Sequence, residues 1–443
     1  MKKAFRVIVI CIFIAALAVS VFSCSKDPYV TATMTVRDDG TFKILQLTDL
    51  HFINSDLEGK SKTKDNLYLR DEWAMTCITD VITKADPDLI VLTGDIVYNL
   101  DEYVGVIEGF NSDNEASFKK VTNFIDGFNI PWTFVFGNHD EEGSLKKKYK
   151  NDKEATKRAL ADYLLSDNLK NCLYANGPDD INGVSNHIIT VENKDGSLNN
   201  ALVMLDSGSF FGTEAWYYDW VHDDQLDWYE KAIKHLAFKH LTTHKNIKSV
   251  IFQHIPFNEY GDVLQTFIQE LEAKGEDWHN TIKVDGKERT ITISEDKTIS
   301  YPLFYNEKQI RTVNVKAGES ITYHFGVYNE GEVCASFIGK WKGSTYDGGN
   351  EFKRLVDFGS AQAVFCGHDH RNTYSFTYKG LRITYGMSVD YSASGLLPRQ
   401  DVFADTEQRG GTLITLNADS SLKVEQVPFT TDLYGAEVAK RGK

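Results

Sequence analysis

Hydrophobic residues along this chain follow two alternating patterns, which predict alternating strands and helices. Short apolar runs bounded by glycine, proline or acidic residues are typical of buried strands. Longer segments repeat apolar residues every three or four positions. In residues 69–85, for example, Leu69, Trp73, Cys77 and Val81 are spaced by four, which indicates an amphipathic helix. Short strands that alternate with helices are typical of an α/β fold with largely buried strands.

The pattern gives the following elements. Strands are expected at residues 42–49, 87–95, 130–140, 201–208, 248–257 and 362–370, helices at residues 69–85, 117–128, 223–238 and 351–359, and a closing hairpin at residues 410–427. The interval 261–350 differs, because it is polar and contains alternating runs such as RTITIS. We predict that this interval is a β-rich insertion, either a lid or a small subdomain beside the functional site.

The first 23 residues have the pattern of an export signal. MKKAFR is a basic start, residues 7–22 are apolar, and Ser23 precedes Cys24. An apolar run of this length is short for a membrane span. VFSC resembles the lipobox of bacterial lipoproteins, although that pattern favours leucine and a small residue where Val and Phe stand. The alternative is an ordinary secretory signal that is cut near the same place.

The predicted domain organisation follows from this signal. Residues 1–23 form the signal peptide, residues 24–40 a polar tether with little core, and residues 41–430 one domain that contains the insertion. A lipid on Cys24 would anchor the exported chain in the bacterial cell envelope, in the periplasm or on the outer surface. The four cysteines that would remain are too few for a disulfide scaffold.

Composition and charge narrow the possible functions. Hydrophobic residues make up 42% and aromatic residues 12% of the chain, which supports a sizeable core and excludes a disordered protein. The formal net charge of −15 leaves no broad basic face for nucleic acid. The same charge would repel an anionic substrate unless positive charge, such as that of metal ions, offsets it locally. The sequence indicates no protein partner.

Potential metal ligands follow five of the apolar runs. In open α/β folds, ligands bind beyond the carboxyl ends of strands. At those ends this chain has Asp49, His51, Asp95, Asn138, His139, His254, His368 and His370. Each alone has a structural explanation: Asp95 after a glycine suits a turn, and a single buried histidine is usually hydrogen-bonded. Five coincidences at the same end of successive strands favour a shared site.

The residue types suit two ions. Carboxylate, amide and imidazole ligands without thiolate fit Zn, Mn or Fe better than a structural cysteine site. With one of the adjacent pair Asn138 and His139 set aside, seven candidates remain, too many for one tetrahedral ion. Because a neutral imidazole cannot bridge two ions, Asp95 is the natural bridging ligand. Two ions about 4 Å apart clamp phosphate oxygens, lower the pKa of bound water and stabilise in-line displacement.

The motifs TDLHF, LTGDIVY, FGNHDE, FQHIPF and CGHDH, in this order, resemble those of the calcineurin-like metallophosphoesterases. The similarity spans about residues 42–390 and is nearest to the purple acid phosphatase-like branch with an Asp-x-His first motif. It implies a four-layer α/β/β/α sandwich with a β-rich insertion, and two divalent transition-metal ions. The resemblance assigns Asp49, His51, Asp95 and His370 to one ion, and Asp95, Asn138, His254 and His368 to the other.

The resemblance also implies roles for residues that are not ligands. His139 would contact phosphate and assist the leaving group, and Asp140 would orient His139 by a hydrogen bond. Tyr98 stands where purple acid phosphatases have a tyrosine ligand, but those enzymes have glycine where this chain has His51. Both candidate ligands would compete for one metal. We expect Tyr98 to be a wall of the pocket.

We therefore expect a binuclear metallophosphoesterase that hydrolyses small phosphate esters, with phosphomonoesters favoured. One alternative is a phosphodiesterase that acts on a nucleotide or a lipid headgroup. Another is a surface lipoprotein that binds ligands through its insertion while its metal site is catalytically idle. The complete set of ligands favours an enzyme, because a decaying site is expected to lose at least one of them.

Overall fold

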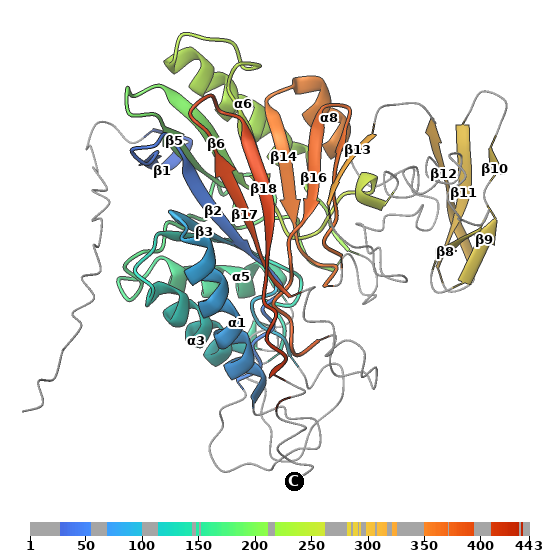
Figure 1. The fold of residues 1–443 in the computed structure, drawn as a ribbon, viewed down its shortest axis with the longest axis horizontal. Coiled ribbons are helices and arrows are strands. Elements are labelled where there is room, and N and C mark those ends of the chain that lie inside the picture. Colours follow the sequence, from blue (N-terminus) through green and yellow to red (C-terminus); the bar gives the residue numbers. More distant parts are fainter. Residues whose placement is uncertain are drawn as a thin grey trace, which may run out of the picture.

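The computed structural model describes residues 27–54, 69–99, 114–143, 148–149, 152–210, 218–261, 350–370, 372–393, 409–433 and 436, together with strands between residues 281 and 325. Within these residues, two large β-sheets pack against each other, and helices cover their outer faces (Figure 1). No helix in this described part of the chain is long and apolar enough to cross a membrane. The predicted signal, residues 1–23, lies outside the described residues.

The first large sheet has five strands in the order β18-β17-β2-β3-β4. The strands are β2 (Phe42–Leu47), β3 (Leu89–Thr93), β4 (Trp132–Val135), β17 (Gly410–Leu416) and β18 (Leu422–Pro428). Strands β2, β3 and β4 are parallel, whereas β17 runs antiparallel to both β2 and β18. The carboxyl ends of the three parallel strands therefore meet at one edge of this sheet.

The second large sheet has eight strands in the order β1-β5-β6-β7-β14-β16-β15-β13. The strands are β1 (Val30–Thr35), β5 (His187–Glu192), β6 (Leu198–Met204), β7 (Ser249–Phe252), β13 (Ile321–Phe325), β14 (Ala361–Cys366), β15 (Ser375–Tyr378) and β16 (Leu381–Tyr385). Its central strands β6, β7, β14 and β16 are parallel. Their carboxyl ends also lie at a common edge.

Three separate hydrophobic clusters define four layers. One cluster packs helices α1 (Arg70–Ala85), α3 (Asn114–Asp126) and α5 (Lys153–Leu164) against the five-stranded sheet. A second cluster lies between the two sheets, and a third packs α6 (Asp223–Lys239) and α8 (Glu351–Phe358) against the eight-stranded sheet. The predicted four-layer α/β/β/α sandwich is confirmed.

The structure corrects the predicted ends of the strands near the site. The strand expected at residues 130–140 ends at Val135, and the strand expected at residues 362–370 ends at Cys366. In both cases the last residues of the predicted strand instead form a loop that begins near a glycine. The candidate ligands therefore stand on loops that extend from the strands, where their side chains can turn toward one another.

Two predicted boundaries in the domain organisation are wrong. The expected tether, residues 24–40, contains strand β1, which pairs with β5 and buries Met34. The insertion expected at 261–350 contains β13, which belongs to the eight-stranded sheet through its pairing with β15. The remaining described strands of the insertion are β8 (Thr281–Val284), β9 (Lys287–Thr290), β10 (Thr292–Ile293), β11 (Thr298–Tyr305) and β12 (Lys308–Lys316). They form two small sheets, as a β-rich segment should.

Candidate metal centre

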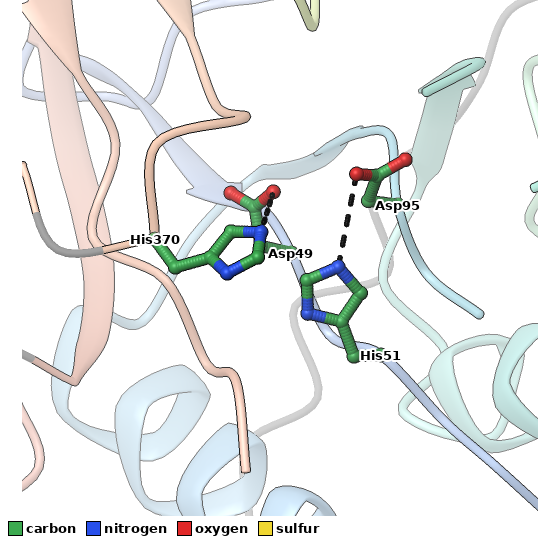
Figure 2. Close-up of side chains that lie close together, drawn as sticks. All are labelled: Asp49, His51, Asp95 and His370. Atoms are coloured by element: carbon green, nitrogen blue, oxygen red, sulfur yellow. Dashed lines mark ion pairs between the residues drawn. The ribbon is translucent and has the colours of Figure 1, made fainter. Parts of the chain in front are cut away.

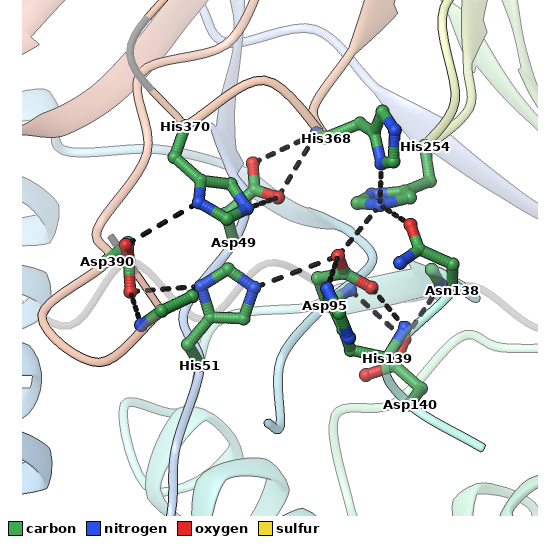
Figure 3. Close-up of polar contacts among 12 residues, drawn as sticks. Asp49, His51, Asp95, Asn138, His139, Asp140, His254, His368, His370 and Asp390 are labelled. Carbon is green, nitrogen blue, oxygen red and sulfur yellow. Dashed lines mark hydrogen bonds and ion pairs between the residues drawn. The ribbon is translucent and has the colours of Figure 1, made fainter. Parts of the chain in front are cut away.

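The predicted ligands meet at one edge of the sandwich, where strands of both sheets end. They are Asp49 and His51 after β2, Asp95 after β3, Asn138 after β4, His254 after β7, and His368 and His370 after β14. Figure 3 shows their side chains pointing toward one another. The site is thus built from loops of two sheets that pack face to face.

Four of these residues have an unusual backbone conformation. Asp49, His51 and Asp95 each have a φ of 50°, and His368 has a φ of 77°. A left-handed backbone is unfavourable for residues other than glycine, and such residues concentrate at functional sites. Ten described residues other than glycine have a positive φ, and four of them direct a carboxylate or an imidazole toward this site.

The loops that carry the ligands approach each other closely. Gly94, which precedes Asp95, has a φ of +83°. A Cβ atom on Gly94 would lie 2.6 Å from the backbone nitrogen of Gly137 and 2.8 Å from Nδ1 of His254. Only glycine fits there without moving the loops after β4 and β7. The glycine of the LTGD motif is therefore needed for the geometry of the site.

The first group of potential ligands consists of Asp49, His51, Asp95 and His370, whose donor atoms all lie within 4.8 Å of one another. Nε2 of His51 lies 3.7 Å from Oδ2 of Asp95, and Nε2 of His370 lies 3.8 Å from Oδ1 of Asp49 (Figure 2). The first three residues are buried, and His370 is partly exposed. Two carboxylates and two imidazoles thus face one small volume.

The second group consists of Asp95, His254 and His368, with Asn138 beside them. From Nε2 of His254, the distances are 3.0 Å to Oδ2 of Asp95, 3.1 Å to Oδ1 of Asn138 and 3.3 Å to Nδ1 of His368. Donor atoms that surround one ion at about 2.1 Å stand about 3.0–3.4 Å apart. The spacing of these four donors therefore matches a single metal ion.

Asp95 belongs to both groups through one oxygen atom. Its Oδ2 faces His51 and His254, which lie on opposite sides of the site. Its Oδ1 instead accepts a hydrogen bond of 2.7 Å from the backbone N–H of His139. This division of the two oxygens suits a bridging carboxylate whose second oxygen holds it in place.

The protonation of the ring nitrogens also fits metal binding. The Nδ1–H of His254 donates to the backbone carbonyl of Thr93 at 2.8 Å, which leaves the lone pair of Nε2 directed into the second group. Nε2 of His51 is buried and has no hydrogen-bond partner among the described residues. Leaving such a group unsatisfied costs about 1–3 kcal/mol. An ion at this point would satisfy it.

Protons compete with metal for two of these histidines. Burial alone lowers the pKa of His51, but Asp390 and Asp95 outweigh burial and raise it to about 10. Asp95 likewise overcomes the burial of His254 and raises its pKa to about 9. A metal ion must displace these protons, because it binds the neutral imidazole. Affinity for metal should therefore rise with pH.

His139 lies beside the ligands, but its orienting partner is not the predicted one. Nδ1 of His139 lies 3.0 Å from Oε1 of Glu142, and Nε2 lies 3.9 Å from Oδ2 of Asp95. The His139 side chain keeps 12% of its surface exposed, so it can reach a molecule bound above the site. Asp95 and Glu142 raise its pKa against the opposing effect of burial. The prediction that Asp140 orients His139 is wrong.

Asp140 has a structural role instead. Its carboxylate accepts hydrogen bonds from the backbone N–H groups of Gly137 at 2.7 Å, Asp95 at 3.1 Å and Ile96 at 2.9 Å. These bonds turn the carboxylate away from the imidazole of the preceding residue and tie the loop after β3 to the loop after β4. Burial and the charge of Asp95 raise the Asp140 pKa to about 7. Asp140 therefore positions the loop that carries Asp95.

Tyr98 packs against the site with its ring. Its centroid lies 5.3 Å from that of His51 and 4.9 Å from that of His139, both in edge-to-face geometry. Burial raises the pKa of the Tyr98 hydroxyl, and the charges of Glu142 and Asp390 raise it further. A phenol in this position resists the deprotonation that a phenolate ligand needs. The edge-to-face ring contacts fit the expectation that Tyr98 packs beside the ligands.

Replacing Tyr98 and His51 in turn tests this assignment. Tyr98→Phe is expected to keep both ions and most of the activity, because His51 would supply a nitrogen to the metal that Tyr98 would otherwise bind. His51→Ala is expected to lose metal. Elemental analysis and a visible absorption spectrum of each variant decide the matter. A tyrosine phenolate bound to ferric iron absorbs visible light. A purple, iron-loaded protein that loses its colour on Tyr98→Phe would therefore show that Tyr98 is the ligand and that His51 is not.

The sequence analysis missed Glu142, Asp390 and Phe210 as neighbours of the candidate ligands. Glu142 beside His139 stands in an acidic run, which usually marks a solvated loop. Asp390, 3.0 Å from His51, follows strand β16, which the hydrophobic pattern did not predict. The rings of Phe210 and Tyr218, 5.4 Å apart, lie near His139 and His368 respectively. Aromatic residues in a loop give no sequence signal that separates a pocket from a core.

Comparison with known proteins identifies the family of this chain. The family model for calcineurin-like phosphoesterases matches residues 42–262, and the chain belongs to this family. A relative from Arabidopsis thaliana, the probable inactive purple acid phosphatase 14, is 24% identical over 81% of this chain and 72% of that protein. Phosphatase DCR2 of Saccharomyces cerevisiae is 30% identical over 50% of this chain and 36% of that protein. The resemblance found in the motifs is confirmed.

A search of solved structures gives a further similarity. The crystal structure of a dimetal phosphatase from Danio rerio aligns with a TM-score of 0.39 at 10% sequence identity. The alignment covers 87% of this chain and 98% of that protein.

Proposed function

We propose that this protein hydrolyses phosphate monoesters with the help of two divalent transition-metal ions. Zn, Mn and Fe all suit the donors, which are carboxylate, amide and imidazole groups. The observation that carries the proposal is the position of Asp95, whose Oδ2 faces both groups of ligands. A single ion would need only one of these groups, whereas this chain assembles both around one shared oxygen.

The residues around the ions have separate tasks in this proposal. When bound, the ions supply positive charge to the phosphate oxygens and lower the pKa of water. His139, which is partly exposed beside Asp95, is placed to donate a proton to the leaving oxygen. Glu142 holds the His139 ring by its other nitrogen. The aromatic residues Phe210 and Tyr218 border the two sides of the site.

A non-catalytic protein that binds ligands is the second candidate, because the Arabidopsis relative carries the name of a probable inactive enzyme. The geometry favours catalysis. The described residues include seven potential ligands in two groups, together with His139 and its partner Glu142. His139 is not one of the proposed ligands, so a site that only binds metal does not need it. A catalytic site does need it, as a proton donor.

The deciding experiment is a screen of the purified protein against monoesters and diesters, combined with elemental analysis. We expect close to two ions per chain, hydrolysis of monoesters in preference to diesters, and loss of hydrolysis in a chelator that zinc or manganese reverses. Two bound ions without hydrolysis would favour the non-catalytic candidate. A preference for diesters would favour the phosphodiesterase alternative.

We also propose that the mature chain begins at Cys24 and carries lipid there, which would place the enzyme in the cell envelope. VFSC after the apolar run supports this proposal. Cys24→Ser is expected to move the protein from the membrane to the soluble fraction of the cell. An unmodified N-terminus beyond Cys24 in the wild type, found by mass spectrometry, would identify an ordinary secretory signal instead.

A further inference from the structure

Asp390 is a buried carboxylate that contacts two of the candidate ligands at once. Its Oδ1 lies 3.0 Å from Nδ1 of His51, and its Oδ2 lies 3.6 Å from Nδ1 of His370 (Figure 3). Only 3% of its surface is exposed. Both histidines belong to the first group of ligands. A single side chain therefore stands behind both nitrogen donors of one predicted metal.

The two contacts leave the opposite nitrogens directed into the site. Nε2 of His51 faces Asp95, and Nε2 of His370 faces Asp49. A neutral imidazole has one N–H and one lone pair. A carboxylate beside Nδ1 favours the tautomer with the proton on Nδ1, which presents the lone pair of Nε2 to a metal.

Asp390 is held in place by contacts that do not involve the histidines. Its Oδ1 accepts hydrogen bonds from the backbone N–H groups of Ser392 at 2.7 Å and Ala393 at 2.8 Å. Its carbonyl oxygen accepts a 2.7 Å hydrogen bond from Nε of Arg409, at the start of the segment that leads into β17. The carboxylate is thus held by hydrogen bonds that do not depend on the two rings, as an orienting group requires.

The second group of ligands has a different support. Nδ1 of His254 donates to the carbonyl of Thr93, and the backbone N–H of His368 donates to the carboxylate of Asp49. The described contacts of Asp390 with ligand rings are to His51 and His370 alone. Loss of this carboxylate should therefore affect the two metals unequally.

We infer that Asp390 is a positioning residue that orients both nitrogen ligands of the first metal and sets the affinity of that one site. The inference rests on the proposed binuclear function. The ring of His51 contacts this carboxylate through Nδ1, on the side opposite to the nitrogen that faces Asp95.

The test is a metal titration of the metal-free protein in three forms: wild type, Asp390→Asn and Asp390→Ser. Asn is nearly isosteric but has no charge and places an N–H₂ group at one of the two contacts. We expect the affinity for one ion to fall by roughly 10–100-fold in the variants, while the other ion binds as in the wild type. With manganese, electron paramagnetic resonance should change from the spectrum of a coupled pair to that of an isolated ion.

Asp88→Asn is the matched control. Asp88 is also a buried aspartate, but it lies before β3, at the opposite end from the ligands, and accepts from Nε of Arg37 and the backbone N–H of Lys43. Asp88→Asn should lower thermal stability and leave both metal affinities unchanged. This variant separates a loss of stability from a loss of one ion.

Each outcome decides a different point. If the wild type holds two ions and both Asp390 variants bind both with unchanged affinity, the inference fails and the proposed function stands. Equal weakening of both sites, or loss of folding in both variants, would show that Asp390 serves the fold and would also overturn the inference. If the wild type itself holds fewer than two ions after metal-replete purification, the proposed function fails first.

Discussion

Asp95→Asn is expected to remove both metal ions and to abolish hydrolysis. The Oδ1 atom of Asp95 accepts a hydrogen bond from the backbone N–H of His139, and Oδ2 faces both groups of ligands. If the new amide keeps its oxygen on the His139 N–H, the N–H₂ group, which has no lone pair to offer, takes the bridging position. If the amide turns over, two donors face each other at His139. Both orientations are unfavourable.

The loss should exceed the effect of removing a neighbour of a ligand. Such outer residues typically cost roughly 10–100-fold in metal affinity or activity. Asp95→Asn changes a ligand of both metals and also removes one negative charge from a buried cluster of histidines. We therefore expect this substitution to be the most damaging of the single ligand changes.

Asp49→Asn provides the matched comparison. It is the same chemical change at a buried aspartate that is a candidate ligand in the first group alone, and the Asn oxygen can still accept from the backbone N–H of His368. Elemental analysis should find about one ion per chain in Asp49→Asn and none in Asp95→Asn. If Asp95→Asn retained one tightly bound ion, or if the two variants lost metal equally, Asp95 would not be the bridge.

The fold could be predicted wherever burial follows the hydrophobic pattern. Helix α1 and strand β3 were predicted because their apolar residues coincide with their buried faces. Helix α5 was not predicted, because Thr156 and Lys157 occupy positions on its buried face. Lys157 tolerates burial through an ion pair of 2.9 Å with Asp206, a residue distant in the sequence. No local pattern reveals such a partner.

Strand β1 was missed for a different reason. Its sequence, VTATMT, alternates three apolar residues with three threonines, but only Met34 of the six is buried. It joins the sheet by backbone hydrogen bonds to β5, and these carry no signature in the side chains. A six-residue edge strand with one buried side chain gives too little hydrophobic signal to separate it from a tether.

The candidate site also contains residues that the sequence predicts and residues that it does not. The ligands could be predicted because each follows a strand, and parallel strands bring their carboxyl ends to one edge. The partners of those ligands could not. Asp390 reaches His51 from the far end of the chain, and Glu142 displaces Asp140 as the partner of His139 because the Asp140 carboxylate is occupied by backbone N–H groups. Such choices depend on the directions of side chains in the folded loop.

His139→Ala is expected to reduce turnover by roughly 10²–10⁴-fold, the usual effect of losing a general acid, while metal content stays near that of the wild type. His139 is not one of the proposed ligands, and its Nε2 lies 3.9 Å from Oδ2 of Asp95. Against the effect of burial, Glu142 and Asp95 raise the pKa of His139, which is the direction that a proton donor needs. Removal of the ring leaves both groups of ligands intact.

The choice of substrate distinguishes proton donation from other roles. Nitrophenyl phosphate has a stable leaving group that needs little protonation, whereas an alkyl phosphate needs a full proton. His139→Ala should therefore slow the alkyl ester much more than the nitrophenyl ester. Glu142→Gln should show the same selectivity with a smaller effect, because the ring remains but loses the charge that lies 3.0 Å from its Nδ1. Equal losses on both esters, or loss of metal from His139→Ala, would assign His139 to substrate binding or to the metal site instead.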